Sequence, residues 1–348
     1  MSHDYKAVQW TPFKKRFDLW MLCGIVLYIV LFIVLGEVNQ PPGESIHPVQ
    51  ALMRATGTLA FLLLTFILCI GPLARMTDRF KPFLYNRRHL GVTTFLIALI
   101  HAALVMMWYH GFSETNPFVS LFISNPRYDS LAGFPFEVLG FGALLIMFLM
   151  AATSHDFWNA NLGPGVWKTL HMGVYLAYAL LIAHVALGAI QFEKSPAYVV
   201  LLAAGATVVV ALHIGTGLAA FRGSDKADTD GWLKVAAVAD MQDARAKIVR
   251  PSDGEAIAVF RDGNKISAVS NVCRHQGGPL GEGKIVDGCI TCPWHGFQYR
   301  MEDGQSPPPF TEKIATYATR IIEGVVYVNP EPNAPGTPQT PSQIGAPS

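Results

Sequence analysis

The chain has 348 residues, of which 51% are hydrophobic and 15% are charged, and its formal net charge is +1 at pH 7. This composition excludes an ordinary soluble globular protein, and the lack of a basic patch argues against a nucleic-acid-binding protein. Apolar residues are concentrated before residue 221, so we expect two domains that meet different solvents.

Six apolar runs in the first part of the chain predict transmembrane helices, because each reaches about the 17 to 25 residues that cross a bilayer core. A polar, basic segment at 1–17 precedes the first run. This run is long enough to span a membrane and no A-x-A cleavage site follows it, so a membrane span is expected rather than a cleaved signal peptide. We expect a six-helix membrane domain at 18–221. Its spans are predicted at about 18–35, 49–71, 90–109, 134–152, 169–190 and 198–220.

The distribution of lysine and arginine predicts the orientation of these spans, because such residues gather in cytoplasmic loops. An even number of spans returns the chain to its starting side. We therefore expect a bacterial inner-membrane protein with both termini and the C-terminal domain in the cytoplasm. The basic residues on that side are Lys6, Lys14, Lys15, Arg16, Arg75, Arg79, Lys81, Arg87, Arg88, Lys168 and Arg222, against Arg127 and Lys194 on the other.

Several histidines lie within or beside the predicted spans. Ionisable side chains are costly in a bilayer, and neutral imidazole is a common axial ligand of haem iron. His101 and His184 are expected at a similar depth, with His171 about 20 Å from His184 along one helix. The partner of His171 stays open between His89 and His213. For any single histidine, a hydrogen bond to a neighbouring helix is the alternative.

Thirteen residues separate His171 from His184. This spacing leaves the two side chains about 140° apart around a straight helix. Two haems would then need a local bulge in the helix or different slots between helices. Arg54, near the outer end of the second span, is a further candidate for binding a haem propionate, and extension to the membrane interface is its alternative role.

Short motifs accompany these histidines between about residues 49 and 190. They are Thr56-Gly57, Gly71-Pro72-Leu73-Ala74-Arg75, Arg87-Arg88-x-Leu90-Gly91, Thr153-Ser154, Leu162-Gly163 and Trp167-Lys168-x-Leu170-His171-x-x-Val174-Tyr175. Together they resemble the ferric-reductase-like transmembrane domain, especially the haem-binding subunits of the MsrQ type. The resemblance implies one or two haem b groups, with His101, His171 and His184 as ligands. Met172 departs from it, because those subunits usually have arginine there.

The last part of the chain has a different pattern. A polar linker is predicted at 222–231, and a small all-β domain at 232–330, because short alternating runs are separated there by Asp-Gly pairs. A tail at 331–348 is rich in Pro, Gln, Ser and Thr, which predicts disorder. The predicted strands include residues 256–260, 265–270 and 325–329.

Two pairs of metal-ligand residues stand out in this β domain. Cys273 and His275 form the first, and Cys292 and His295 form the second. Two thiolates on one iron and two imidazoles on the other can hold a [2Fe–2S] cluster. The oxidised cluster then carries no net charge, so it accepts an electron more readily than one held by four thiolates. Structural zinc is the alternative, because the same four residues satisfy a tetrahedral ion.

The spacing of these four residues is accompanied by glycines and prolines suited to tight loops, and the whole pattern resembles a Rieske ferredoxin domain. The additional residues are Gly277, Gly278, Gly296 and the run Pro307-Pro308-Pro309. The resemblance implies an iron–sulfur cluster rather than zinc. Rieske domains of the quinol-oxidising type usually add a cysteine to each loop, where this chain has Gly278 and Trp294. A ferredoxin-like member of lower potential is therefore expected.

Two aromatic residues bear on the potential of the cluster. Tyr299 is expected to donate a hydrogen bond to a ligand sulfur, which would raise the potential. Phe297 stands where high-potential members have a hydroxyl residue, so we expect an intermediate potential at most.

These features predict a multi-domain membrane electron-transfer protein, a component of an oxidoreductase rather than a self-contained enzyme. The expected donor is a cytoplasmic NAD(P)H-dependent reductase or ferredoxin, because the chain has no flavin or nicotinamide motif. The expected acceptor lies on the outer face: a methionine-sulfoxide reductase-like periplasmic enzyme, or alternatively a ferric chelate, a quinone or dioxygen. A redox-sensing membrane protein stays open. A Rieske oxygenase is excluded, because the β domain has no further histidines for a mononuclear iron.

Overall fold

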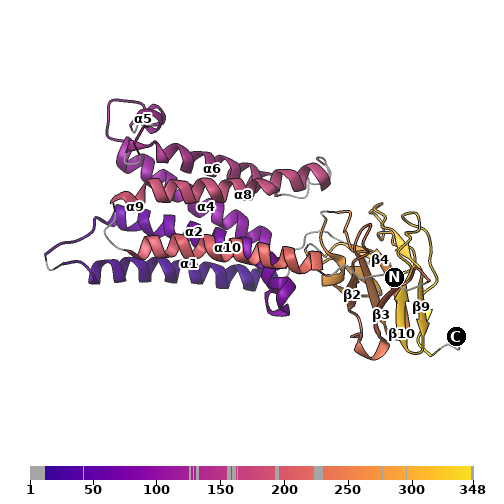
Figure 1. Cartoon of the computed structure of the whole chain (residues 1–348). Coiled ribbons are helices and arrows are strands. Elements are labelled where there is room, and N and C mark those ends of the chain that lie inside the picture. Colours follow the sequence, from indigo (N-terminus) through magenta and orange to yellow (C-terminus); the bar gives the residue numbers. More distant parts are fainter. Residues whose placement is uncertain are drawn as a thin grey trace. The chain divides into compact units, whose positions relative to one another are not determined.

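The computed structural model describes residues 12–41, 43–124, 127, 129–130, 133–154, 158, 162, 164–192, 196–222, 230–275, 277–294 and 296–345. These residues form two compact units, one helical and one built of β-strands (Figure 1). The domain limits expected from the sequence stay a prediction.

The helical unit consists mainly of long apolar helices, as the six runs predict. They are α1 (Pro12–Val38), α2 (Pro48–Met76), α4 (Arg87–Val105), α6 (Phe136–Ala152), α8 (Pro164–Leu187) and α10 (Pro196–Arg222). Shorter helical segments join them: η1 (Asp78–Phe80), α3 (Lys81–Tyr85), the π-helical η2 (Met106–His110), α5 (Pro117–Ile123) and α9 (Ala189–Phe192).

Among the described residues, five helices are long and apolar enough to cross a membrane. The sixth expected span, residues 134–152, forms the shorter helix α6 of 17 residues. The structure therefore confirms a helical, membrane-like first part, while the count of six spans stays a prediction.

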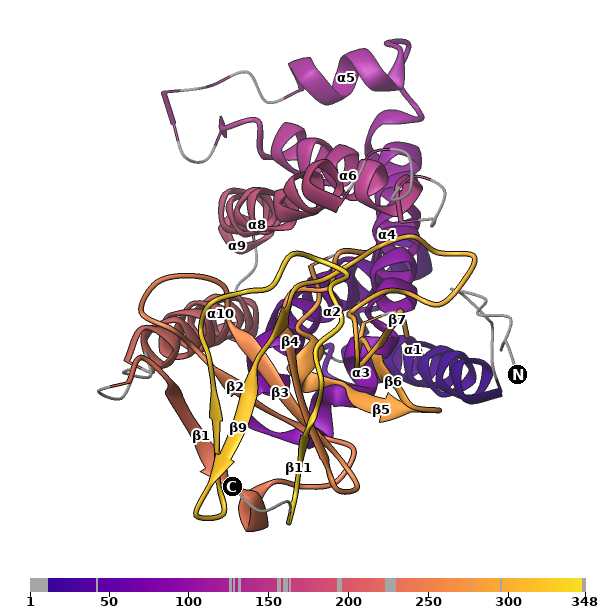
Figure 2. The ribbon, with the colours of Figure 1, turned by 90° about the vertical axis from the view of Figure 1, so that its right-hand side faces the viewer.

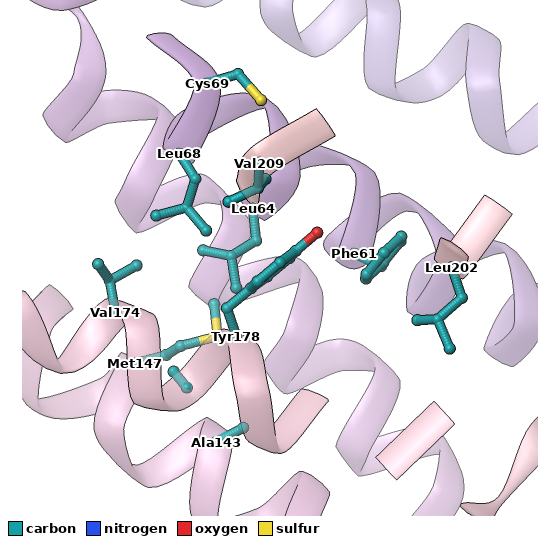
Figure 3. Packing of buried hydrophobic residues seen from close by; sticks show 11 residues of the cluster. Phe61, Leu64, Leu68, Cys69, Ala143, Met147, Val174, Tyr178, Leu202 and Val209 are labelled. Carbon is teal, nitrogen blue, oxygen red and sulfur yellow. The ribbon is translucent and has the colours of Figure 1, made fainter. Parts of the chain in front are cut away.

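Helix α2 lies at the centre of the helical unit, with α1, α4 and α10 around it, as the end-on view shows (Figure 2). Its apolar side packs with α6, α8 and α10 around Tyr178 (Figure 3). The Tyr178 ring stacks on Phe61 with centroids 5.8 Å apart, and its hydroxyl lies 2.9 Å from Oγ1 of Thr65. Because a phenol in an apolar core needs a hydrogen-bond partner, Thr65 stabilises this packing.

The β unit contains three small antiparallel sheets. Their strand orders are β1-β10-β9, then β11-β4-β3-β2 with β8 also paired to β4, and β5-β6-β7. The bounds are β1 (Leu233–Ala237), β2 (Ala246–Val249), β3 (Ile257–Asp262), β4 (Lys265–Ser270), β5 (Lys284–Val286), β6 (Cys289–Thr291), β7 (Gln298–Arg300), β8 (Thr316–Tyr317), β9 (Thr319–Ile322), β10 (Val325–Val328) and β11 (Ser342–Gln343).

The three predicted strands appear as β3, β4 and β10. Gly263 and Asn264 form the tight turn of the β3–β4 hairpin, which the pair of Asp262 with Lys265 closes. The small all-β domain expected after the membrane part is thus confirmed.

The expectation of a disordered tail is wrong for residues 331–345. Strand β11 pairs with β4, and the Oγ of Ser342 donates to the carbonyl of Thr319 at 2.7 Å. The amide of Asn333 donates to the carbonyl of Thr316 at 2.9 Å. A tail of polar and proline residues can follow an extended path when a neighbouring sheet edge supplies the hydrogen-bond partners that a helix would supply internally.

Candidate functional site

The first ligand loop follows β4. Cys273 is 1% exposed, and its amide donates to the carbonyl of Gly278 at 2.9 Å. Its own carbonyl accepts from the amide of Gly277 at 2.7 Å. Gly277 has φ +72°, a conformation that favours glycine, and the bridge between Val272 and Pro279 closes the loop. These bonds hold the Cys273 sulfur inside the domain.

The second ligand loop connects β6 to β7 and repeats this geometry position by position. Cys292 is fully buried, and its amide donates to the carbonyl of Phe297 at 2.8 Å. Its carbonyl accepts from the amide of Gly296, which also has φ +72°. In each loop, the cysteine binds residues four and five positions later. The sequence predicted tight turns at these glycines, and the structure places them there.

The two loops interlock at Gly278. A Cβ atom at Gly278 would stand 2.8 Å from the sulfur of Cys292 and 3.1 Å from the ring of Trp294. Glycine is therefore required here so that the second sulfur can approach the first loop. Gly278 and Trp294, the two positions at which quinol-oxidising Rieske domains carry their extra cysteines, lie against each other instead.

His275 of the first loop is oriented by stacked aromatic rings. Its ring lies parallel to Phe297, with centroids 4.8 Å apart and an interplanar angle of 7°. Phe297 in turn packs on Phe310 from the segment after the proline run, at 5.0 Å. The Nδ1 atom of His275 is buried, although the residue as a whole is partly exposed. This orientation suits a ligand that binds iron through one nitrogen and presents its other edge to solvent. His295, the fourth expected ligand, lies outside the described residues.

Tyr299 lies beside the first ligand sulfur, as predicted. Its hydroxyl is 3.5 Å from the sulfur of Cys273 and accepts a hydrogen bond from the Arg274 amide at 2.9 Å. Burial and the neighbouring Cys273 raise the pKa of Tyr299 far above its ordinary value, so the phenol keeps its proton. Because the Arg274 amide already occupies the oxygen as a donor, the phenolic proton is available to the sulfur.

Two buried cysteine sulfurs in matched loops, with an oriented imidazole and a phenol donor beside them, fit a [2Fe–2S] cluster. The thiolates would be Cys273 and Cys292. When bound, such a cluster supplies one-electron redox chemistry. Cys289, three residues before Cys292, forms no disulfide within the described residues, and it is partly buried.

In the helical unit, His101 on α4 is held by α2. Its Nδ1 lies 2.9 Å from the carbonyl oxygen of Met53. A carbonyl only accepts hydrogen bonds, so Nδ1 carries the proton and Nε2 of the neutral ring keeps its lone pair. The ring packs against Gly57, where a Cβ atom would stand 2.9 Å from it.

His184 on α8 is held by α6 in the same manner. Its Nδ1 lies 2.8 Å from the carbonyl oxygen of Phe136, and the ring packs against Gly140, where a Cβ atom would stand 2.7 Å from Nδ1. In both cases the glycine follows the carbonyl residue by four positions and therefore lies on the same helix face, one turn further on.

Metal-binding histidines almost always donate their second ring nitrogen to a carbonyl or carboxylate, which fixes the tautomer and the ring orientation. His101 and His184 both show this arrangement, with Nε2 as the nitrogen left to bind. Their donor set fits a haem iron held between α4 and α8.

The other candidate haem ligands have different surroundings. In His213, Nδ1 lies 2.8 Å from the Val209 carbonyl of its own helix, and Nε2 lies 3.0 Å from the hydroxyl of Tyr175. His89 uses Nδ1 to bind the carboxylate of Asp18 at 2.7 Å. The hydroxyl of Tyr175 therefore engages the lone pair that His213 would need for iron.

His171 has a buried Nε2 atom and shares helix α8 with His184. This helix is α-helical throughout Pro164–Leu187. A bulge between the two histidines is therefore absent, and their side chains leave the helix about 140° apart. Two haems on this helix would have to occupy different slots between helices.

Arg54 lines a cavity of about 620 Å³ between α1, α2 and the start of α10. It follows Met53 directly, so it leaves α2 about 100° around the helix from the residue that holds His101. Tyr28 and Thr58, joined by a hydrogen bond of 3.0 Å, line the same cavity. Binding of a haem propionate by Arg54 stays a prediction.

Sequence reasoning missed the roles of Gly140 and His110. Gly140 leaves room for the His184 ring four residues after Phe136, whose carbonyl holds that ring. Such a spacing becomes meaningful only when the helix that carries the histidine is known to pack there. His110 is 2% exposed and lies in the π-helical end of the third span. Its burial could not be predicted from the sequence, because His110 stands at the start of the long segment between the third and fourth expected spans.

Comparisons with known proteins divide the chain in the same way. The family described as ferric reductase like transmembrane component matches residues 56–182, and the Rieske [2Fe-2S] domain matches residues 231–318.

Individual relatives match one part or the other. The protein-methionine-sulfoxide reductase heme-binding subunit MsrQ of Ralstonia nicotianae is 29% identical over 169 residues, which are 49% of this chain and 70% of that protein. Ferredoxin CarAc of Metapseudomonas resinovorans is 33% identical over 98 residues, which are 28% of this chain and 92% of the ferredoxin. The anthranilate 1,2-dioxygenase ferredoxin subunit of Burkholderia cepacia is 39% identical over 74 residues, 21% of this chain and 68% of that subunit. The chain thus belongs to the Rieske ferredoxin family through its C-terminal domain, and its first part carries a ferric-reductase-like transmembrane domain that is similar to the MsrQ subunits.

Proposed function

We propose that this protein passes single electrons between a Rieske [2Fe–2S] cluster and b-type haem within the membrane. The observation that carries the proposal is the matched arrangement of His101 and His184, each of which donates Nδ1–H to a carbonyl of a neighbouring helix. The relatives support it, since one group are named heme-binding subunits and the other ferredoxins. The cofactors are a [2Fe–2S] cluster and haem.

The residues of the chain have separate tasks in this transfer. Cys273, His275, Cys292 and His295 would hold the cluster, and Tyr299 would stabilise charge on a ligand sulfur as the electron arrives. His101 and His184 would hold one haem. His171 would bind a second, whose other ligand stays open between His89 and His213.

The proposed topology has six spans, including the short α6, with both termini and the Rieske domain in the cytoplasm. The bias of Lys and Arg between the two sets of loops supports it. In this arrangement the membrane domain covers residues 18–221, a linker covers 222–231, and the Rieske domain covers 232–330. Electrons would enter at the cluster and leave at the opposite face.

The proposed electron donor is a cytoplasmic NAD(P)H-dependent reductase or a ferredoxin. The proposed acceptor is a periplasmic oxidoreductase, and the relationship to MsrQ favours a methionine-sulfoxide reductase-like enzyme. A ferric chelate, quinone or dioxygen reductase of the same architecture is the alternative, as is a redox-sensing membrane protein.

The test uses the purified full chain under anaerobic conditions. A pyridine haemochrome assay measures haem, and electron paramagnetic resonance measures the reduced cluster. NADH with a ferredoxin reductase is then added, and the Soret band is followed. We expect the haem to become reduced in the wild-type chain but not in His275→Ala. A colourless protein, or haem that stays oxidised while the cluster is reduced, contradicts the proposal.

A further inference from the structure

A buried polar cluster lies at the end of α4, outside the haem-binding histidines. His110, the last residue of η2, is 2% exposed. Its Nδ1 lies 2.8 Å from Oγ of Ser120, and its Nε2 lies 3.5 Å from a carboxylate oxygen of Glu137. The second carboxylate oxygen of Glu137 accepts a hydrogen bond from Ser124 at 3.0 Å. Four side chains, from η2, α5, the residue that caps α5, and α6, thus lie together, joined by two hydrogen bonds and by the 3.5 Å approach of His110 to Glu137.

Helix α5 reaches this network with one face only. Ser120 and Ser124 are one helical turn apart, so they lie on the same side of α5. The other side exposes apolar residues, including Phe118 at 62% and Phe122 at 47%. The two serines therefore tie an otherwise apolar external helix to His110 and Glu137.

Glu137 connects the network to the proposed haem ligand. It is 12% exposed and directly follows Phe136, whose carbonyl accepts the Nδ1 proton of His184. A buried carboxylate is costly unless it is paired or hydrogen-bonded; here Ser124 donates a hydrogen bond, and Nε2 of His110 lies 3.5 Å away.

We propose that His110 and Glu137 form a charge-compensated pair that sets the reduction potential of the haem held by His184. The inference rests on the proposed function. A negative charge near haem iron stabilises the oxidised form and lowers the potential, more strongly in a poorly solvated site than in water. In the proposed pair a protonated His110 offsets this effect, and the hydrogen bond with Ser120 orients its ring. Both residues act through their field and through the Phe136 carbonyl, so they are positioning residues.

The experiment measures haem midpoint potentials by anaerobic titration of the full chain, with the cluster signal as an internal reference. Glu137→Gln removes the charge and keeps the shape, so we expect the potential of one haem to rise. His110→Leu leaves the carboxylate uncompensated, so we expect that potential to fall. The double variant should match Glu137→Gln alone, because no charge is left to compensate. At a fixed solution potential, we expect the ratio of reduced to oxidised haem to change at least tenfold. For a one-electron couple this corresponds to a shift of about 59 mV in the midpoint potential.

Glu114→Gln is the matched control, since Glu114 is an exposed glutamate of the same external segment. It should leave both potentials unchanged. If the His110→Leu protein loses haem, Ser120→Ala provides a second test. It changes only the orientation of His110, so we expect it to lower the haem potential by a smaller amount than the loss of the His110 side chain would. A haem-loaded Glu137→Gln protein with the wild-type potential overturns the inference and leaves the proposed function intact. Failure of the wild-type haem to accept electrons from the cluster, by contrast, counts against the proposed function.

Discussion

The imidazole of His184 lies so close to Gly140 that a Cβ atom there would stand 2.7 Å from Nδ1. Gly140→Ala should therefore push the ring away from the Phe136 carbonyl and weaken haem binding. Loss of such a supporting contact typically costs about 10–100-fold in metal affinity. The ratio of haem to protein, from a pyridine haemochrome assay, measures the effect. Gly142→Ala on the same helix is the control, because its Cβ would meet Leu180 at an ordinary 3.6 Å. Equal haem content in the two variants would argue against a haem at His184.

His184 and His213 make a second matched pair of substitutions. His184→Ala should remove at least one haem, because it deletes a ligand. His213→Ala should retain that haem, because both ring nitrogens of His213 already have partners in Val209 and Tyr175. Absorbance spectra of the purified variants give the measurement. Loss of the same haem in both would assign His213 as a ligand.

At the other cofactor, His275→Ala should abolish the electron paramagnetic resonance signal of the reduced cluster and leave haem absorbance unchanged. The expected loss is complete, because one iron loses half of its protein ligands. A surviving signal would show that His275 is not a ligand.

The hydroxyl of Tyr299 provides a test of cluster tuning. Tyr299→Phe removes the donor to Cys273, so the sulfur keeps more negative charge and the cluster potential should fall. Redox titration of the cluster signal measures this shift. Tyr317→Phe, another buried tyrosine of the β unit, is the control. An unchanged potential in Tyr299→Phe would mean that the phenol does not bond to the sulfur.

The ordered tail should contribute to the stability of the β unit. Deleting residues 331–348 removes β11 and the bonds to Thr316 and Thr319. Each net hydrogen bond is worth about 1 kcal/mol, and in a domain of this size a loss of about 1 kcal/mol lowers the Tm by about 4–8 °C. Thermal loss of the cluster's visible circular dichroism gives the measurement. A Tm equal to that of the full chain would mean that the tail binds the sheet too weakly to matter.

The sequence predicted the cluster site in more detail than the haem site. The loop geometry around Cys273 and Cys292 is local: each cysteine bonds to residues four and five positions later, so spacing and glycine content foretell it. The prediction that His101 and His184 lie at a similar depth followed from their positions along the expected spans. Their supports, Met53 and Phe136, did not follow, because each carbonyl is 48 residues away on another helix.

The sequence by itself determined that the chain has a membrane part and a water-exposed part, and that the first part is helical. It also determined which residue types are available to hold a cluster. Hydrophobic run length and short-range spacing carry this information, because both are properties of neighbouring residues. Only the tertiary structure decided that α8 is unbroken between its histidines, that the tail joins a sheet, and that His110 meets Glu137. These outcomes depend on which helix faces and strand edges meet. That choice is made by packing between segments distant in the chain, where local patterns carry no information.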